Sequence, residues 1–219
     1  MQKIKLLLAL LLFYIRLNSV SAQTVTDADG NKIPVITIGK QIWMAENLKT
    51  TKFNDGKAIP FVTNDKAWKI METPAYCWLN NDIANKEVYG ALYNWYTVNT
   101  KKICPTGWHV PSRTEWDDMI IFLGDENIAG AKLKEAGTDH WKNSIHISTN
   151  EYGFTALPGG LRLMGGNFPE FASSYAVWWS ATEFSKIAAW NRGVFFSSSK
   201  AFGGNDNKKN GFSVRCVKD

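Results

Sequence analysis

Histidine and cysteine, which often carry catalysis or bind transition metals, are scarce in this chain, with three of each in 219 residues. No two histidines stand four positions apart, the spacing that places both on one helix face for a zinc ion. The chain also has no Gly-x-Ser-x-Gly segment, and its Gly-Gly pairs lack the lysine and hydroxyl residue of a phosphate-binding loop. The sequence therefore indicates no catalytic residues and no cofactor, and we expect a protein that is not an enzyme.

Long apolar stretches are missing too, apart from one run of ten residues at positions 6–15. That run is too short to span a bilayer, which takes about 20 residues. Lys3 and Lys5 precede it, and the small residues Ser19-Val20-Ser21-Ala22 follow, which is the layout of a secretory signal peptide. We predict that residues 1–22 are a signal peptide and that residues 23–219 form a single domain without a transmembrane segment. The mature protein is expected to be secreted or at the cell surface, with the periplasm as the alternative.

A strong excess of one charge is absent from the mature chain. The whole sequence carries a net charge of +5, but three basic residues and no acidic one lie in residues 1–22, so the net charge falls to +2. A nucleic-acid-binding domain usually shows a basic patch and a high net positive charge. We therefore expect no nucleic-acid partner.

Tryptophan, in contrast, is abundant, with ten residues in the chain. Each buried aromatic side chain contributes a large apolar area to a core. An exposed tryptophan can instead provide a flat platform for a sugar. For any single tryptophan we favour a place in the core, because this residue type is mostly buried in folded proteins.

The three cysteines are Cys77, Cys104 and Cys216. Outside the cytoplasm, two of them should form a disulfide bond. Cys77 stands in the apolar segment Ala75–Leu79, so we interpret it as a buried free thiol.

Local patterns predict a hairpin first and helices later. Residues 35–38 and 41–44 are rich in β-forming residues and flank Gly39-Lys40, as in a β-hairpin. Ser112 and Glu115 form a capping-box pattern, which predicts a helix from there to Gly124. A second helix is expected over about 127–136. Further strands are expected at 153–157, 177–181, 190–196 and 211–217, so the fold class is α+β.

Several segments, in the same order, resemble a known family, the Fibrobacter succinogenes major paralogous domain family of secreted and surface proteins from Bacteroidetes- and Fibrobacteres-type bacteria. The matching segments are Asp29-Gly30-Asn31, Ile38–Leu48, Tyr89–Trp95, Cys104–Ser112 with Glu115-Trp116, Gly153-Phe154, Leu157–Arg162, Trp179–Thr182 and Gly211–Val217. Together they cover nearly the whole mature chain.

This resemblance implies a C-type-lectin-like fold, with two helices, a twisted antiparallel sheet and long irregular loops behind the N-terminal hairpin. It also implies a disulfide bond between Cys104 and Cys216. It implies little about activity, because function resides in sites and not in folds.

A calcium-dependent lectin site is one alternative. Sugar-binding C-type lectins resemble one another in a Glu-Pro-Asn or Gln-Pro-Asp loop, and this chain lacks that motif. Asn80-Asn81-Asp82 and Asn205-Asp206-Asn207 offer oxygen ligands without a recognised spacing. The segment from Asp27 begins like a calcium loop, but its twelfth residue is Ile38 instead of glutamate. We expect these segments to form turns and predict no metal site.

An oxidase related to the formylglycine-generating enzymes, which look similar in fold, is a second alternative. The resemblance implies chemistry that needs reactive cysteines to bind copper, since soft thiolates suit Cu(I). Cys216 is the only cysteine late in the chain and is better explained as a disulfide partner.

A binding site in the long loop region, residues 163–176 and their surroundings, is the alternative we favour. Aromatic faces with a few amides and charges suit sugar or peptide recognition. The predicted ligand-binding residues are Arg162, Asn167, Phe168, Glu170, Tyr175, Trp178, Trp190 and Arg192. We therefore expect a surface module that recognises a glycan or a protein; the competing hypothesis is a structural surface or adhesin component without a small ligand.

Overall fold

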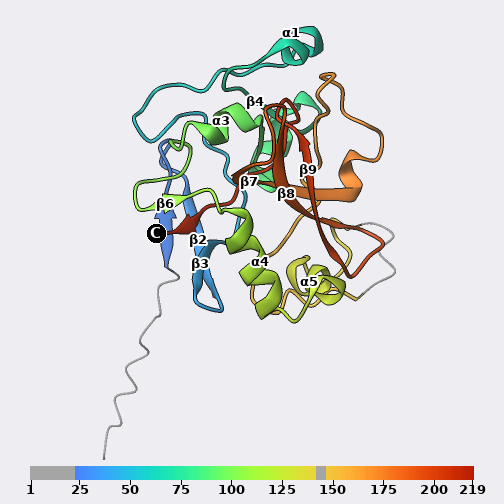
Figure 1. Ribbon diagram of the computed structural model, residues 1–219. Coiled ribbons are helices and arrows are strands. Elements are labelled where there is room, and N and C mark those ends of the chain that lie inside the picture. The colour runs from blue at the N-terminus through green and yellow to red at the C-terminus, as the bar shows by residue number, and fades with distance from the viewer. Residues whose placement is uncertain (1–22, 142–146) are drawn as a thin grey trace, which may run out of the picture.

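The structure is a computed structural model that describes residues 23–141 and 147–219 (Figure 1). The predicted signal peptide, residues 1–22, lies outside the described residues. The strands are β1 (Thr24–Thr26), β2 (Lys32–Ile38), β3 (Gln41–Met44), β4 (Tyr76–Trp78), β5 (Ala91–Tyr93), β6 (Trp108–His109), β7 (Tyr175–Glu183), β8 (Ala188–Phe195), β9 (Ala201–Asn207) and β10 (Val217–Lys218). The α-helices are α1 (Asp65–Ile70), α2 (Lys86–Tyr89), α3 (Trp95–Asn99), α4 (Arg113–Phe122) and α5 (Glu126–Leu133).

The predicted N-terminal hairpin is confirmed as β2 and β3. It turns at Gly39-Lys40, where Gly39 has a φ of 61°, a conformation that glycine adopts without steric cost. The hairpin belongs to a five-stranded sheet in the order β1-β2-β3-β10-β6. Val217 of β10 lies between Trp43 of β3 and His109 of β6, so segments far apart in sequence meet in this sheet.

A second sheet has the order β7-β8-β9, and β4 pairs with β5 in a third, smaller one. All pairings between these named strands are antiparallel. The predicted strands at 177–181 and 190–196 correspond to β7 and β8, although β8 ends one residue earlier. The protein is therefore a mixed α and β fold built on antiparallel sheets, as the α+β prediction required.

Two of the predicted strands are not regular strands. Residues 153–157 form a loop with one bridge, Lys134 to Ala156. Residues 211–217 form single bridges to three different segments, through Gly211, Phe212 and Ser213, before β10 begins at Val217. This last segment is buried throughout, so it fills the centre of the molecule instead of lying along one sheet.

Helix α4 has the predicted capping box. The Glu115 amide donates to the Ser112 hydroxyl at 3.2 Å, and the Ser112 amide donates to the Glu115 carboxylate at 2.7 Å. Helix α5 ends at Leu133, short of the predicted end at about residue 136, because Lys134 turns to an extended conformation. The Lys134 ammonium is buried and donates to the carbonyls of Phe195 at 3.2 Å and Ser198 at 2.9 Å. Lys134 therefore bonds to the end of β8 and the β8–β9 connection instead of continuing helix α5.

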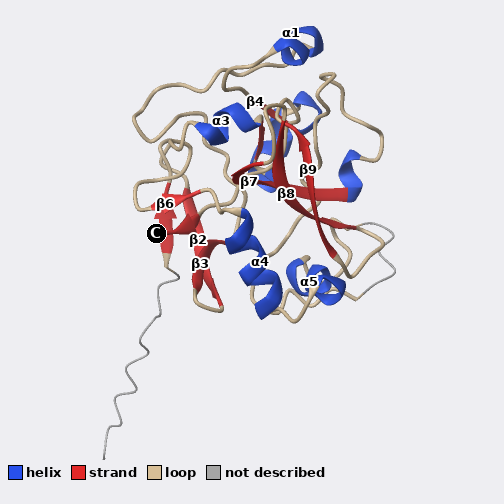
Figure 2. Cartoon of the chain, in the orientation of Figure 1, coloured by secondary structure: helices blue, strands red, loops and turns tan. Residues whose placement is uncertain are grey.

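Three of the five α-helices within the described residues, α1, α2 and α3, were not expected and have at most six residues each. Helix α1 begins at a cap in which the Asn64 side chain accepts from the Ala67 amide at 3.0 Å. Between α5 and β7 the described residues form mainly loops (Figure 2), the long irregular region that the sequence predicts.

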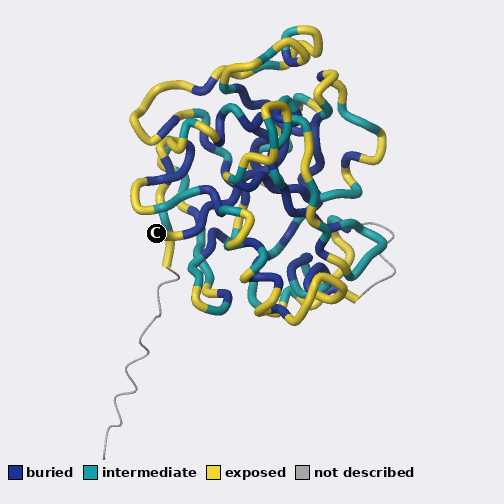
Figure 3. Tube along the Cα trace, in the orientation of Figure 1, coloured by how far each residue is buried: buried dark blue, intermediate teal, exposed yellow. Residues whose placement is uncertain are grey.

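The core is dominated by tryptophan, and the buried segments converge on the central strands (Figure 3). Eight of the ten tryptophans are buried, namely Trp43, Trp68, Trp78, Trp95, Trp116, Trp141, Trp178 and Trp179. Trp108 and Trp190 are half-buried. The preference for core positions therefore holds for most tryptophans, and only these two keep a surface that a ligand could reach.

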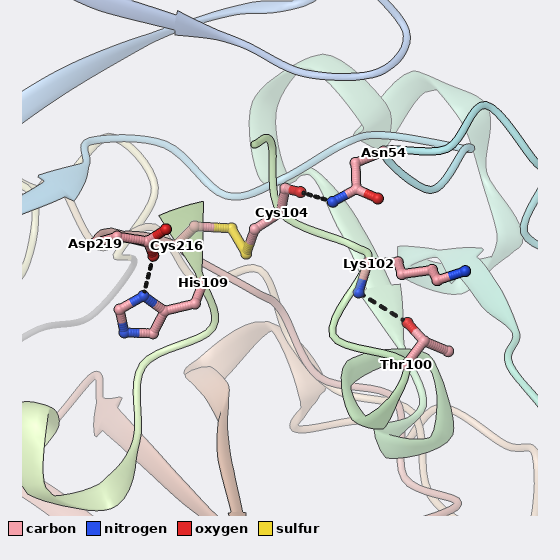
Figure 4. The surroundings of a disulfide bond; sticks show 7 residues. All are labelled: Asn54, Thr100, Lys102, Cys104, His109, Cys216 and Asp219. Atoms are coloured by element: carbon pink, nitrogen blue, oxygen red, sulfur yellow. Dashed lines mark hydrogen bonds and ion pairs between the residues drawn. A yellow bond between two sulfur atoms is a disulfide. The ribbon is translucent and has the colours of Figure 1, made fainter. Parts of the chain in front are cut away.

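Cys104 and Cys216 form the disulfide bond that the family resemblance implies, with Cα atoms 6.0 Å apart (Figure 4). It joins the segment before β6 to the segment before β10. The Asn54 side-chain amide donates to the Cys104 carbonyl at 3.1 Å, which fixes a third part of the chain beside the bond. Cys77 is free and buried, as predicted, and burial raises the pKa of its thiol to about 12.

Candidate functional site

A pocket of about 350 Å³ lies between α4 and the strands β8 and β9, and it is the candidate site. We call it the α4–β8 pocket. Its walls are Arg113, Trp116, Asp117, Ile120, Ile121, Glu126, Ser180, Trp190, Asn191, Arg192 and Gly203. The volume falls in the range of small-ligand pockets, which is roughly 300–1,000 Å³.

Trp190 of β8 is the aromatic residue at the outer wall of this pocket. The Arg113 guanidinium carbon lies 3.8 Å from the centre of its ring, which is a close cation–π stack. Phe184 packs perpendicular to the same ring with centroids 5.3 Å apart. The stack holds the Arg113 side chain, which is half exposed, along the mouth of the pocket. Trp190 therefore provides apolar surface and also positions hydrogen-bond donors.

Arg192 forms the inner wall and is only 5% exposed. Its guanidinium donates to Glu126 at 2.6 Å and makes a short contact with Asp117. These two carboxylates come from α5 and α4, so the arginine ties both helices to the sheet. A buried charge needs this kind of pairing, because an unpaired one would lose its hydration without compensation.

Gly203 of β9 allows Arg192 to take this position. A Cβ atom at residue 203 would lie 2.8 Å from an Arg192 guanidinium nitrogen, closer than a carbon atom can approach without displacement. The neighbouring Gly204 has more space, since a Cβ atom there would meet Asn191 no closer than 3.6 Å. Position 203 is thus restricted by the arginine and position 204 is not.

Two N–H groups in the pocket wall have no hydrogen-bond partner among the described residues. They are Nε1 of Trp116 and Nε of Arg192, and both are buried. An unpaired buried donor costs about 1–3 kcal/mol relative to a satisfied one. Both residues line the same pocket.

Of the predicted ligand-binding residues, only Trp190 and Arg192 are brought together in the α4–β8 pocket. Trp178 is completely buried, and its indole donates to Asn47 at 2.8 Å. Tyr175 is half-buried and packs on Phe195 with ring centroids 4.5 Å apart. Asn167 and Glu170 are exposed on the loop before β7.

Arg162 is fully buried in a different place, where it holds the segment around α1. Its guanidinium donates to the carbonyls of Val62 at 2.6 Å and Thr63 at 2.8 Å, and to Asp65 at 2.9 Å. The Trp68 ring lies 4.3 Å from the guanidinium carbon, and the ring of the predicted residue Phe168 lies 5.1 Å from it. The polar atoms of this arginine are directed at its own chain.

Sequence reasoning missed the acidic and basic residues that helices contribute to the pocket. Arg113 and Asp117 stand four positions apart on α4 and form an ion pair at 3.5 Å, and Glu126 opens α5. The spacing of the first two was visible in the sequence. Their meeting with β8 was not, because it depends on how α4 packs against a sheet formed some 70 residues later.

No cluster of three potential metal-binding side chains occurs within residues 23–141 and 147–219. The Asp27 carboxylate accepts from the amides of Asp29 at 3.0 Å and Asn31 at 2.9 Å, so this segment forms a self-satisfied turn. In the α4–β8 pocket, the Arg192 guanidinium already occupies the space between the two carboxylates.

A histidine beside the disulfide is held between two carboxylates. His109 Nδ1 lies 2.6 Å from Asp219 Oδ1 (Figure 4), and Nε2 lies 2.8 Å from Glu115 Oε1. Partial burial alone would lower the pKa of His109, but hydrogen bonds to Asp219 and Glu115 outweigh it, so the pKa is raised. The Ser112 hydroxyl donates to Glu115 at 2.8 Å, not to the histidine. In a serine triad the serine hydroxyl hydrogen-bonds to the imidazole. Here Glu115 lies between Ser112 and His109, so the three residues are not arranged as a triad.

The profile of the Fibrobacter succinogenes major domain family matches residues 36–218, which is most of the chain. The protein belongs to this family. No curated protein and no solved structure matched the chain. None of the helices in the described part of the chain is long and apolar enough to cross a membrane.

Proposed function

We propose that this protein is an exported, non-catalytic binding module with a C-type-lectin-like arrangement, and that it binds a neutral glycan in the α4–β8 pocket without calcium. The proposal keeps the expectation of a surface recognition module from the sequence. It moves the site from the long loop to the pocket between α4 and β8, which contains two of the predicted residues, Trp190 and Arg192.

The observation that carries the proposal is the composition of this one pocket. It combines one of the two tryptophans that are not fully buried with two arginines and two carboxylates. The four charges sum to zero, so the pocket attracts neither an anion nor a cation strongly. Sugars are neutral, carry hydroxyls that donate and accept, and present C–H faces to aromatic rings. Ligand sites generally combine apolar walls with a few oriented polar groups in this way.

The unpaired donors of Trp116 and Arg192 support the same ligand class. Each needs an acceptor oxygen, which a hydroxyl or an acetamido carbonyl provides. The donors are buried, so such an oxygen has to reach into the wall of the pocket. A purely apolar ligand would leave both donors unsatisfied, at the cost stated above.

Independence from calcium follows from Arg192. In a calcium-dependent lectin, carboxylate and amide oxygens coordinate the ion together with sugar hydroxyls. Here Asp117 and Glu126 are paired with the guanidinium, and a divalent ion would have to displace a buried positive charge.

Export rests on the sequence pattern of residues 1–22. It agrees with the disulfide bond between Cys104 and Cys216, since such bonds persist in oxidising compartments. The C-type-lectin-like description rests on the family resemblance, together with antiparallel sheets and a long loop region.

The test is a screen of purified residues 23–219 on an array of defined bacterial, plant and animal glycans, in calcium and again in EDTA. We expect the protein to bind at least one glycan, with the same affinity in calcium and in EDTA. Binding that disappears in EDTA would contradict the metal-free pocket. Binding to no glycan would overturn the proposal and favour a protein partner or a structural role.

A matched pair of tryptophan variants localises the site. Trp190→Ala removes the aromatic wall and the platform for Arg113, so it should weaken binding about tenfold or more. Trp108→Ala truncates the other half-buried tryptophan, which does not line the pocket, and should leave affinity unchanged. Equal affinity of Trp190→Ala and the wild type, with both folded by circular dichroism, would place the glycan elsewhere.

A further inference from the structure

A second depression lies on the opposite flank of α4 and shares one residue with the α4–β8 pocket. It measures about 600 Å³ and is lined by Ile38, Gly39, Lys40, Gln41, Asp118, Ile121 and Phe122. We call it the hairpin groove, because residues 38–41 are the turn of the β2–β3 hairpin. Ile121 lines both depressions and is 70% exposed. The two therefore meet at one side chain on the surface of the helix, which lies between hairpin and sheet (Figure 1).

The position of the groove is fixed by contacts between α4 and the hairpin. The Gln41 side-chain amide donates to the Glu115 carbonyl at 3.1 Å, which joins the two elements. The Phe122 ring rests against Gly39, where a Cβ atom would come within 3.1 Å of it. Tyr152 packs against the edge of the same ring, with centroids 5.4 Å apart. Phe122 is thus held in place while 49% of it remains exposed.

The groove has the same chemical character as the pocket. Phe122 offers an aromatic surface, and Lys40 and Asp118 offer one positive and one negative group. All four charged residues of the pocket are ion-paired. Lys40 and Asp118 make no ion pair or side-chain hydrogen bond within the described ranges, so both are available to hydroxyls. The charges again cancel, which favours a neutral polar ligand over a charged peptide.

Length argues for one ligand across both depressions. The two depressions lie on opposite flanks of α4, and a helix with its side chains is about 10–12 Å across. One pyranose ring does not bridge that span, but two or three linked rings do, with the aliphatic Ile121 between them.

From this continuity we infer that the ligand is an oligosaccharide of at least two or three sugars, with one end in the α4–β8 pocket and the next units crossing Ile121 to pack on Phe122. The inference rests on the proposed glycan function and specifies the size of ligand for which the surface is built.

The test compares ligand lengths by isothermal titration calorimetry. The probes are the best-bound glycan of the array and its shortened forms, from the monosaccharide to the tetrasaccharide. For the wild type, we expect affinity to rise from one to three sugars. Phe122→Ala should reduce affinity for the trisaccharide about two- to tenfold and leave the monosaccharide unaffected. Phe61→Ala is the matched control, since Phe61 is also 49% exposed but lies outside both depressions.

Lys40→Ala provides a second variant that does not depend on packing, because this exposed side chain has no partner within the described ranges. It should also weaken only the longer ligands. Monosaccharide affinity equal to that of the tetrasaccharide, or a folded Phe122→Ala that binds every length like the wild type, would overturn the inference. If Trp190→Ala still lost binding while Phe122→Ala did not, the proposal of a glycan site in the α4–β8 pocket would stand without the longer ligand. If the wild type bound no glycan at all, the pocket proposal and the oligosaccharide inference would both be overturned.

Discussion

Trp116 differs from six of the other seven buried tryptophans in the hydrogen bonding of its indole N–H. Six buried tryptophans donate to an acceptor: Trp43, Trp68, Trp95, Trp141, Trp178 and Trp179. Trp116 is as deeply buried and packs against Trp43 with centroids 4.7 Å apart, but its N–H has no partner in the part of the chain that the structure describes. Buried indoles usually find one. The exception belongs to a residue that lines the α4–β8 pocket, the site of the proposed glycan.

Three buried arginines show that one residue type serves different ends. Arg215 donates to Asn47 and to the backbone of Phe154 and Thr155, and burial lowers its pKa to about 9. Arg162 likewise binds backbone carbonyls and so holds a loop. Only Arg192 is neutralised by two carboxylates beside a pocket. The sequence could not distinguish these cases, because the partners of each arginine are distant in the chain: Val62 and Asp65 for Arg162, Asp117 and Glu126 for Arg192, and Asn47 for Arg215.

The His109 contacts make stability depend on pH. The pKa of His109 is raised in the folded protein above its ordinary value of 6.5. The folded state therefore binds the proton more tightly than the unfolded state, which stabilises the protein fully below about pH 6.5. The contribution disappears as pH rises through the raised pKa. We expect the Tm of the wild type to fall as the pH rises from about 6.5 through the raised pKa of His109, measured by calorimetry in buffers of equal ionic strength.

His109→Gln is the matching variant, since glutamine can still donate to a carboxylate but does not titrate. Its Tm should be lower than that of the wild type at about pH 6 and should lose the slope above it. The contribution of the neighbouring Glu115 to stability has the opposite pH dependence. Partial burial alone would raise the pKa of Glu115, but hydrogen bonds from Ser112 and His109 lower it overall. Its contribution is present above its ordinary pKa and is lost in acid. Parallel Tm curves for wild type and variant would refute the histidine contribution.

At the scale of elements, β9 determines whether the inner wall of the pocket can form. Gly203→Ala places a Cβ atom 2.8 Å from the Arg192 guanidinium and should push it away from Glu126 and Asp117. Gly203 is exposed and the close contact is with the end of a flexible side chain, so we expect a loss of at most about 1 kcal/mol in the free energy of unfolding, together with weaker glycan binding. Urea unfolding and the glycan titration measure the two effects.

Gly204→Ala is the control one residue away, where the nearest atom is 3.6 Å from the added carbon. That change should be neutral or slightly stabilising, because alanine restricts the unfolded chain. Equal behaviour of the two variants would mean that Arg192 is not confined by β9 and that the pocket wall can rearrange.

The elements that could be predicted are those specified by local sequence. The hairpin around Gly39-Lys40 and the capping box at Ser112 need only neighbouring residues, and both are present. β9 was missed because Gly203-Gly204 and the Asn-Asp residues after it resemble a turn; pairing with β8 overrides that preference. The pocket was missed for the same kind of reason, since α4, α5 and β8 contribute to it and only β8 had been considered.

At the scale of the whole molecule, residues 210–217 connect parts that would otherwise be separate. This buried segment bridges β5 through Phe212, the Arg162 loop through Gly211 and β7 through Ser213, before β10 joins the hairpin sheet. Cys216 anchors it covalently to Cys104. The α4–β8 pocket depends on this arrangement, because β7 links the central segment to β8 and α4 packs on both strands.

The disulfide should therefore stabilise the whole fold instead of one loop. It joins residues 112 positions apart, and a closed loop of that size restricts the unfolded chain strongly. Replacing Cys104 and Cys216 by serine should lower the free energy of unfolding by about 2–5 kcal/mol in a urea titration. Cys77→Ala is introduced in both the disulfide-containing protein and the double serine variant, so that the free thiol cannot exchange with the disulfide. Adding dithiothreitol should bring the stability of the disulfide-containing protein down to that of the double variant, which should itself not respond. A disulfide-containing protein whose stability is unchanged by full reduction, verified by thiol titration, would show that packing of residues 210–217 alone holds the molecule together.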